Sequence, residues 1–182
     1  MNGKAMYAGV LIGIGNIINL SVGNKYVGAL LFSFALMTIM QCDLPLYTGR
    51  IGYYDEYKIT EFWEILCWNC CGVLLSTVMG VIAIPSLWDK FISPERFADL
   101  PYVYLFRGIL CGICMYVAVS SNKSLIVIMA IMIFILAGFR HCIAEFPFVI
   151  LNASRESFVA FVLIVAGNSI GSIMARILHK EM

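Results

Sequence analysis

The segment Leu136-Ala-Gly-Phe-Arg-His-Cys-Ile-Ala-Glu-Phe146 decides how the rest of this sequence is interpreted. The stretch Ser124–Phe139 that leads into it carries no charged residue, and Arg140, His141 and Glu145 then follow within a few positions. Ionisable side chains at the end of such an apolar stretch are costly in a bilayer and by default indicate a functional site. We therefore predict that His141 lies in the middle of a membrane pore.

The composition places the whole chain in a membrane. Of its 182 residues, 62% are hydrophobic and 13% are charged, and the mean hydropathy is +0.92. A soluble domain typically has about 25% charged residues. The net charge of +1 provides no basic surface for nucleic acid. We expect a single transmembrane domain over residues 1–182, whose first hydrophobic stretch is a transmembrane helix and not a signal peptide.

Six hydrophobic segments follow one another along the chain. They cover approximately residues 5–22, 26–41, 62–87, 101–120, 124–139 and 157–178. A bilayer core of ~30 Å needs about 20 helical residues. The second and fifth segments fall short of this length before they run into polar interruptions, so we expect these two transmembrane helices to be broken.

A shift of 99 residues superimposes the two halves of the sequence. The matched pairs are Gly9 and Gly108, Gly13 and Gly112, Asn69 and Asn168, Gly72 and Gly171, and Cys42 and His141. Because three is an odd number, a repeated three-helix unit enters the membrane from opposite sides. We therefore predict an all-α integral membrane protein of six transmembrane helices, in inverted repeats at approximately residues 5–87 and 101–178. Interrupted helices at corresponding positions of such repeats indicate a transport site near the midplane.

The pattern of the cysteines indicates apolar packing, not metal binding or redox activity. They are Cys42, Cys67, Cys70, Cys71, Cys111, Cys114 and Cys142, all in or beside apolar segments. The two Cys-x-x-Cys pairs lack the partner histidines or second polar-loop pair of a zinc site, and cysteine packs well as a small apolar residue, so we expect a packing role. We expect no metal and no cofactor. Since no nucleophile–base or metal motif is present, we also expect no enzymatic activity.

Several segments together resemble the formate/nitrite transporter family. The segments that carry the resemblance are Leu30–Leu36, Leu46-Tyr-Thr-Gly49, Arg107–Gly112 with Ala118-Val119, Gly138-Phe-Arg-His-Cys-Ile-Ala144, and the residues Asn69, Gly72, Asn168 and Gly171. The resemblance covers nearly the whole chain. It implies an aquaporin-like protomer with its own pore in a homopentamer, which conducts small monovalent anions or their conjugate acids such as formate, nitrite or hydrosulfide.

The same resemblance assigns residues to the substrate pathway. The central histidine of the family corresponds to His141, and its loop threonine corresponds to Thr48. The other positions of the implied pathway, which include the apolar constrictions, are Phe32, Leu36, Leu46, Tyr47, Met115 and Phe134. On the residues alone, Thr48 could equally cap the turn that follows it, and the apolar positions could be ordinary helix packing.

Charged residues mark where this chain departs from the family pattern. Arg140 stands where the family has an acidic residue, and Glu145 stands where it has asparagine. Arg140 could pair with Glu145, or with Asp43 across the two breaks. Arg107 could raise the anion concentration at the pore mouth or merely reach the membrane interface. Gly112 replaces an asparagine of the family, which predicts a larger site around the histidine.

A histidine between apolar constrictions suits the passage of a weak acid. A bare monovalent anion pays an idealised cost of order 20 kcal/mol to enter an apolar medium, whereas its neutral acid pays far less. Histidine exchanges protons near neutral pH. We therefore expect a channel or proton-linked transporter for small monovalent anions or weak acids. The alternative is a pore for a small neutral solute such as hydrogen sulfide, ammonia or water.

The distribution of basic residues gives a weak signal for orientation. Lys and Arg on the side of both termini slightly outnumber those on the opposite side. The positive-inside rule then favours cytoplasmic termini. We expect the protein to lie in the lipid of a cell membrane, the inner membrane of a bacterium.

Overall fold

The computed structural model describes residues 2–121 and 123–181, and the regular structure of these residues is entirely helical. The elements are α1 (Asn2–Ser21), α2 (Lys25–Gln41), α3 (Tyr47–Arg50), η1 (Ile51–Tyr53), α4 (Ile59–Ala83), α5 (Leu87–Phe91), η2 (Pro94–Phe97), α6 (Pro101–Ser120), α7 (Ser124–Leu136), α8 (Cys142–Leu151) and α9 (Arg155–Lys180). The predicted all-α fold is confirmed for the described residues.

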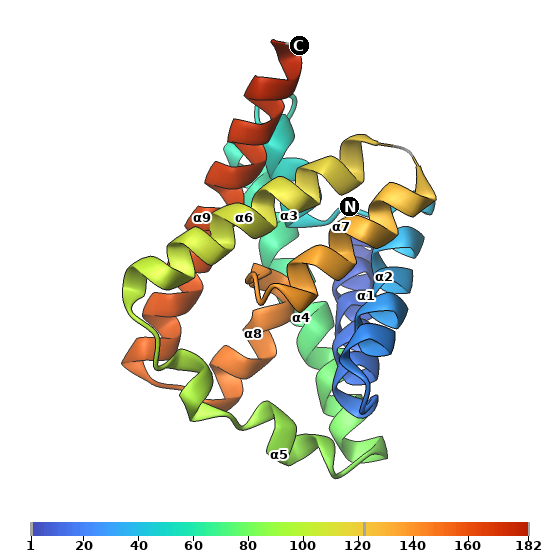
Figure 1. Cartoon of the computed structure of the whole chain (residues 1–182), viewed down its shortest axis with the longest axis vertical. Coiled ribbons are helices and arrows are strands. Elements are labelled where there is room, and N and C mark those ends of the chain that lie inside the picture. Colours follow the sequence, from blue (N-terminus) through green and yellow to red (C-terminus); the bar gives the residue numbers. More distant parts are fainter. Residues whose placement is uncertain (1, 122, 182) are drawn as a thin grey trace.

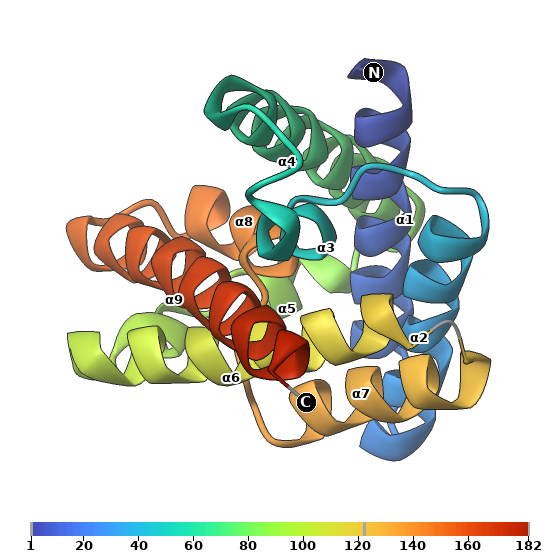
Figure 2. The same cartoon turned by 90° about the horizontal axis from the view of Figure 1, so that it is seen from above.

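Four helix pairings build the body of the molecule. The most extensive pairings join α6 to α9 and α1 to α4, and α2 packs against both α1 and α7 (Figure 1). Seen from above, the short helices α3 and α8 lie in the middle of this assembly (Figure 2). The long helices therefore surround the two short helices. Thr48 lies within α3, and His141 directly precedes α8.

Close backbone packing in the two strongest pairs depends on glycine. A Cβ atom on Gly72 of α4 would lie 2.0 Å from the backbone oxygen of Met6, and one on Gly171 of α9 would lie 2.0 Å from that of Ile109. Small residues that let helix backbones approach each other are the usual basis of association within membranes.

The glycines of α1 and α6 show that the sequence comparison paired these two helices one turn out of step. A Cβ on Gly9 would meet the backbone oxygen of Asn69 at 2.1 Å, and a Cβ on Gly112 would meet that of Asn168 at 2.3 Å. Gly112, and not Gly108, is therefore the counterpart of Gly9 in these contacts.

Two polar breaks interrupt apolar helices. The helix α2 ends at Gln41, and α3 begins five residues after Cys42, whereas α7 ends at Leu136 and α8 begins at Cys142. Asp43 (φ 46°) and Gly138 (φ 73°) adopt left-handed backbone conformations that turn the chain at these breaks. The cap position before α3 is Leu46, and the cap position before α8 is His141. The counterpart of His141 is thus Leu46, not Cys42.

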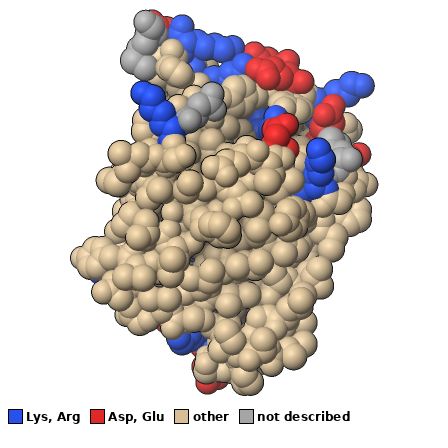
Figure 3. Space-filling model, turned by 90° about the vertical axis from the view of Figure 1, so that its right-hand side faces the viewer, with Lys and Arg blue, Asp and Glu red and all other residues tan. Residues whose placement is uncertain are grey.

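The surface fits a membrane environment. The helices α4, α6 and α9 are each long and apolar enough to cross a membrane, by length and composition, whereas α2, α7 and α8 are apolar but shorter. Many large apolar side chains point outward, such as Phe34 (61% exposed) and Ile82 (76% exposed). The face shown in Figure 3 carries its charged residues at the two ends, with a broad uncharged band between them. These features support an integral membrane protein.

We predict that Gly171→Ala destabilises the protein by about 3 kcal/mol, because its methyl group would overlap the α6 backbone, which cannot move aside as a flexible side chain would. Thermal unfolding in detergent measures this change. The matched control is Gly23→Ala, where no neighbouring atom lies within 4 Å of the added Cβ. Equal melting temperatures for the two variants would contradict the packing described here.

Candidate functional site

His141 forms the centre of the site through both of its ring nitrogens. As the N-cap of α8 it accepts a hydrogen bond at Nδ1 from the backbone N–H of Ala144 (3.3 Å), and its Nε2 lies 2.9 Å from Oγ1 of Thr48. An amide N–H can only donate, so a neutral ring in this position carries its proton on Nε2. Nε2 then donates to Thr48, whose own hydroxyl hydrogen is left to point at a third group. Both side chains are almost fully buried.

Asn69 of α4 holds the segment that contains Thr48. Its Nδ2 donates to the backbone oxygens of Ala5 (2.7 Å) and Pro45 (3.0 Å), and its Oδ1 accepts from the backbone N–H of Tyr47 (2.9 Å). One side chain thus binds α1 on one side and the start of α3 on the other. Backbone groups exposed at a helix break must find such partners where water is excluded.

Asn168 of α9 does the same for the segment that contains His141. Its Nδ2 donates to the backbone oxygens of Gly108 (2.9 Å) and Arg140 (2.8 Å), and its Oδ1 accepts from the backbone N–H of Cys142 (2.9 Å). The two asparagines therefore make equivalent sets of hydrogen bonds. Together they fix Thr48 and His141 opposite each other.

The far end of α9 fastens the loop that follows Thr48. The hydroxyl of Ser172 donates to the backbone oxygen of Thr48 (3.4 Å), and Arg176 donates to the backbone oxygen of Gly52 (3.1 Å). The guanidinium of Arg176 also forms ion pairs with Asp55 and Glu56. This arrangement holds α3 in place against α9.

Aromatic rings line the approach to His141. The ring of Phe134 from α7 stacks on the imidazole, with centroids 6.0 Å apart and planes 25° apart, and the ring of Phe32 from α2 meets Phe134 edge-on at 6.1 Å. Leu36 follows Phe32 by one turn of α2, and both side chains are buried. The imidazole of His141 thus lies against an apolar wall formed by Phe32, Leu36 and Phe134.

Two cavities approach this wall from opposite ends of α2. The upper cavity, of about 270 Å³, has Leu36, Leu46, Asp43 and Arg50 among its lining residues. The lower cavity, of about 310 Å³, has Phe32, Phe134, His141, Arg107, Arg140 and Glu145 among its lining residues. Phe32, which lines the lower cavity, and Leu36, which lines the upper cavity, lie about one helical turn apart on α2.

The structure does not bring every predicted pathway residue to these two cavities. Tyr47 turns its hydroxyl toward α9, where it lies 2.8 Å from Oγ of Ser169. Met115 is buried, and neither Tyr47 nor Met115 lines the upper or the lower cavity. Thr48 also lies behind the lining, but its hydrogen bond to His141 ties it to the site.

The expectation that Gly112 enlarges the site is wrong. Its missing side chain would point at the backbone of Asn168 in α9, so no asparagine would fit there. Asn16 of α1 supplies an amide near the histidine instead: it lines the lower cavity and donates to the backbone oxygen of Ala144 (2.8 Å). Sequence reasoning missed Asn16 because the asparagines of this apolar helix belong to no motif.

The charged residues at the breaks pair locally. Arg140 binds Glu145 (3.1 Å), which was one of the two predicted pairings, whereas Asp43 binds Arg50 (2.5 Å), so the pairing of Asp43 with Arg140 across the breaks is wrong. Arg96 of η2, which the sequence did not single out, adds two short hydrogen bonds to the same Glu145 carboxylate (2.6 and 2.8 Å).

Comparison with known proteins supports the fold. No protein-family model matches the sequence, and no curated protein sequence matches it. The chain is similar to the solved structure of an "FNT family ion channel", with a TM-score of 0.83, 17% sequence identity and coverage of 99% of this chain and 88% of that chain. It is also similar to a "Pentameric formate channel with formate bound", with a TM-score of 0.70, 20% identity and coverage of 98% and 92%.

The chain has the fold of the FNT channels. The predicted resemblance to the formate/nitrite transporter family is therefore confirmed for the fold. At these sequence identities the likeness concerns the path of the backbone alone. In this chain His141 lines the lower cavity, and Asn168 binds the backbone of its two neighbours, Arg140 and Cys142. What passes between the two cavities has to be argued from the side chains.

We predict that Thr48→Val destabilises the protein by about 1–3 kcal/mol, because it leaves the buried Nε2–H of His141 without an acceptor. Thr48→Ser keeps a hydroxyl at the same position and should retain most of that stability. Thermal unfolding of both variants in detergent measures the difference. If valine and serine behaved alike, the hydrogen bond to His141 would have no energetic role.

We predict a larger loss for Asn168→Ala, of about 3 kcal/mol, because three hydrogen bonds of about 1 kcal/mol each disappear from the buried break. Asn19→Ala is the matched control, since the structure gives the Asn19 side chain no hydrogen bond within the described residues. Chemical or thermal unfolding should rank Asn168→Ala well below both the control and wild type. A melting temperature equal to that of the control would show that the hydrogen bonds of Asn168 do not stabilise the helix break.

Proposed function

We propose that this chain is a member of the formate/nitrite transporter family and forms a pore for small monovalent anions and their conjugate weak acids. The observation that carries the proposal is the buried Thr48–His141 pair beside the apolar side chains of Phe32 and Leu36, each of which lines one of the two cavities. The pair supplies hydrogen-bond donors without a fixed charge, at the point where an anion would otherwise have no partner. Formate, nitrite and hydrosulfide are the substrates that suit it.

The geometry supports a preference for weak acids over anions of strong acids. Between Phe32 and Leu36 an anion loses its hydration, while a neutral acid crosses at a much lower cost. The hydroxyl hydrogen of Thr48 is left free to donate to an anion that reaches the Thr48–His141 pair, because its oxygen already accepts from Nε2 of His141. Protonation of the anion then decides whether it crosses.

We infer that His141 supplies this proton after first taking one up. Uptake at Nδ1 breaks the cap bond from Ala144 and gives an imidazolium ring. The ring can then pass its Nε2 proton to the oxygen of Thr48, while Thr48 passes its hydroxyl proton to the anion. The products are a neutral imidazole, an intact hydroxyl and a neutral acid, so one proton accompanies each anion.

The assembly and orientation follow from the same proposal. We infer a homopentamer with one pore in each protomer, because one neighbour of this fold is described as a pentameric formate channel. Within the protomer, α1–α4 and α6–α9 would form two inverted repeats of three spans each. Both termini would lie in the cytoplasm of a bacterial cell. The matching hydrogen bonds of Asn69 and Asn168 support the repeat.

Transport by purified protein in liposomes tests the proposal. Wild type should carry formate, nitrite, acetate or hydrosulfide at rates that rise as the pH falls from about 8 to about 5, because more histidine is protonated. His141→Asn should reduce the flux by roughly tenfold or more, equivalent to at least ~1.4 kcal/mol in the barrier. His179→Asn is the matched control, since the other histidine of the chain lies near the end of α9 and bonds to Tyr116.

The same assay separates the two candidate functions. Passage of water, ammonia or hydrogen sulfide that is unchanged in His141→Ala, together with no movement of any anion in wild type, would replace the proposal with a pore for neutral solutes. Anion flux that is reduced only in His141→Asn, and not in His179→Asn, would support it.

A further inference from the structure

A third asparagine, Asn16 of α1, binds the first turn of the helix that His141 caps. Its Nδ2 donates to the backbone oxygen of Ala144 (2.8 Å) and so connects α1 to α8. Asn16 is only 6% exposed, and it lines the lower cavity together with His141. Asn69 and Asn168 hold the two helix breaks, and Asn16 makes a comparable contact just beyond the second break.

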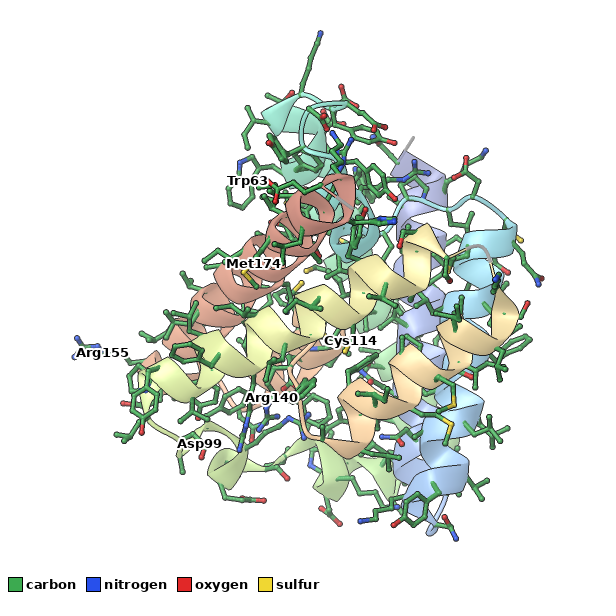
Figure 4. The ribbon with its side chains drawn as sticks, turned by 45° about the horizontal axis from the view of Figure 1, so that its top comes forward. Trp63, Asp99, Cys114, Arg140, Arg155 and Met174 are labelled. Atoms are coloured by element: carbon green, nitrogen blue, oxygen red, sulfur yellow. The ribbon has the colours of Figure 1, made fainter. Side chains whose placement is uncertain are left out.

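The first turn of α8 depends on support from outside the helix. Pro147 lies inside α8 and has no N–H, so the backbone oxygen of Ile143 loses the hydrogen bond that it would have in a regular helix. Figure 4 shows Arg140, which precedes this turn, in the interior of the molecule, and its side chain is only 12% exposed. Where bulk water has little access, the bond from Asn16 supplies part of the support that the proline removes.

Ala144 also decides which ring nitrogen of His141 carries the proton. Its N–H donates to Nδ1 over 3.3 Å, a long hydrogen bond that a small movement of the turn would break. On the other side of the ring, the hydroxyl of Thr48 can either accept from Nε2 or donate to it. The choice between the two neutral forms of the ring is therefore made at Nδ1, by the position of Ala144.

This choice determines what Thr48 can offer to a substrate. When Nε2 carries the proton, the threonine oxygen accepts it, and the hydroxyl hydrogen stays available for an anion. When Nδ1 carries the proton, Nε2 becomes an acceptor, and the hydroxyl of Thr48 donates to it instead. The second form of the ring thus takes the hydroxyl donor away from the anion.

We propose that Asn16 is a positioning residue, which keeps the proton of neutral His141 on Nε2 by holding Ala144 in place. This role rests on the proposed function and deepens it, because it identifies the contact that leaves the hydroxyl hydrogen of Thr48 available. Asn16 acts through the backbone of Ala144 and requires no contact with the substrate.

Nitrogen NMR of the imidazole tests this role, because the spectrum shows which ring nitrogen carries the hydrogen. The chain has two histidines, so a reference protein with His179→Asn and isotope-labelled histidine reports on His141 alone. The protein is studied in lipid bilayers without substrate, at a pH of about 8, where histidine is neutral. The Nε2–H form should predominate in this reference protein.

Asn16→Ala in the reference protein should lower the ratio of the Nε2–H form to the Nδ1–H form by roughly fivefold, equivalent to ~1 kcal/mol, because the cap bond from Ala144 is lost. Asn19→Ala is the matched control, since Asn19 lies one turn further along α1, lines the same cavity and makes no side-chain hydrogen bond within the described residues. If Asn16→Ala fails to fold, Asn16→Asp repeats the test, because an ionised carboxylate of the same shape cannot donate to Ala144.

Predominance of the Nδ1–H form in the reference protein would overturn the inference. So would an unchanged ratio in the Asn16 variants, even with a lower melting temperature, or an equal change in Asn19→Ala. Because the ring is observed without substrate, the result is independent of transport. The expected ratios without anion flux in wild type would overturn the pore and retain Asn16 as the residue that positions His141, whereas flux with unchanged ratios would do the reverse.

Discussion

The structure depends on a requirement for hydrogen bonding at two helix breaks. A membrane offers no water to backbone groups in its interior, so each break must find partners within the protein. Asn69 and Asn168 supply them, and each joins a long helix to the start of a short one. Without these contacts, Thr48 and His141 would have no fixed position.

Function at the site follows from how these breaks are closed. The cap of α8 occupies Nδ1 of His141, so the opposite nitrogen faces Thr48 and leaves the threonine hydroxyl free to donate. The charged residues of the lower cavity belong to the same break, through Arg140 and Glu145. Structural closure and the proposed chemistry therefore share residues, which limits how far either can vary alone.

The sequence predicted those features that leave a local signature. An apolar stretch that turns polar within a few residues indicated the break at His141, and the spacing of Arg140 and Glu145 allowed for their pairing. Nothing in the sequence indicated the role of Arg96, because it lies in a connector without hydrophobic periodicity and meets Glu145 only in the folded chain. The register of α1 against α6 was also misread from the sequence: Gly108 and Gly112 stand one turn apart, so Gly9 falls on a glycine in either register.

The spacing of the two cavities along α2 has an electrical consequence. In the proposed pore, water would fill both cavities, and the transmembrane voltage would fall mainly across the segment between Phe32 and Leu36, about one helical turn of α2. A full charge moved across the membrane is worth about 2.3 kcal/mol per 100 mV. A bare anion would pay or gain most of that energy within one helical turn, while a neutral acid would cross it without sensing the voltage at all.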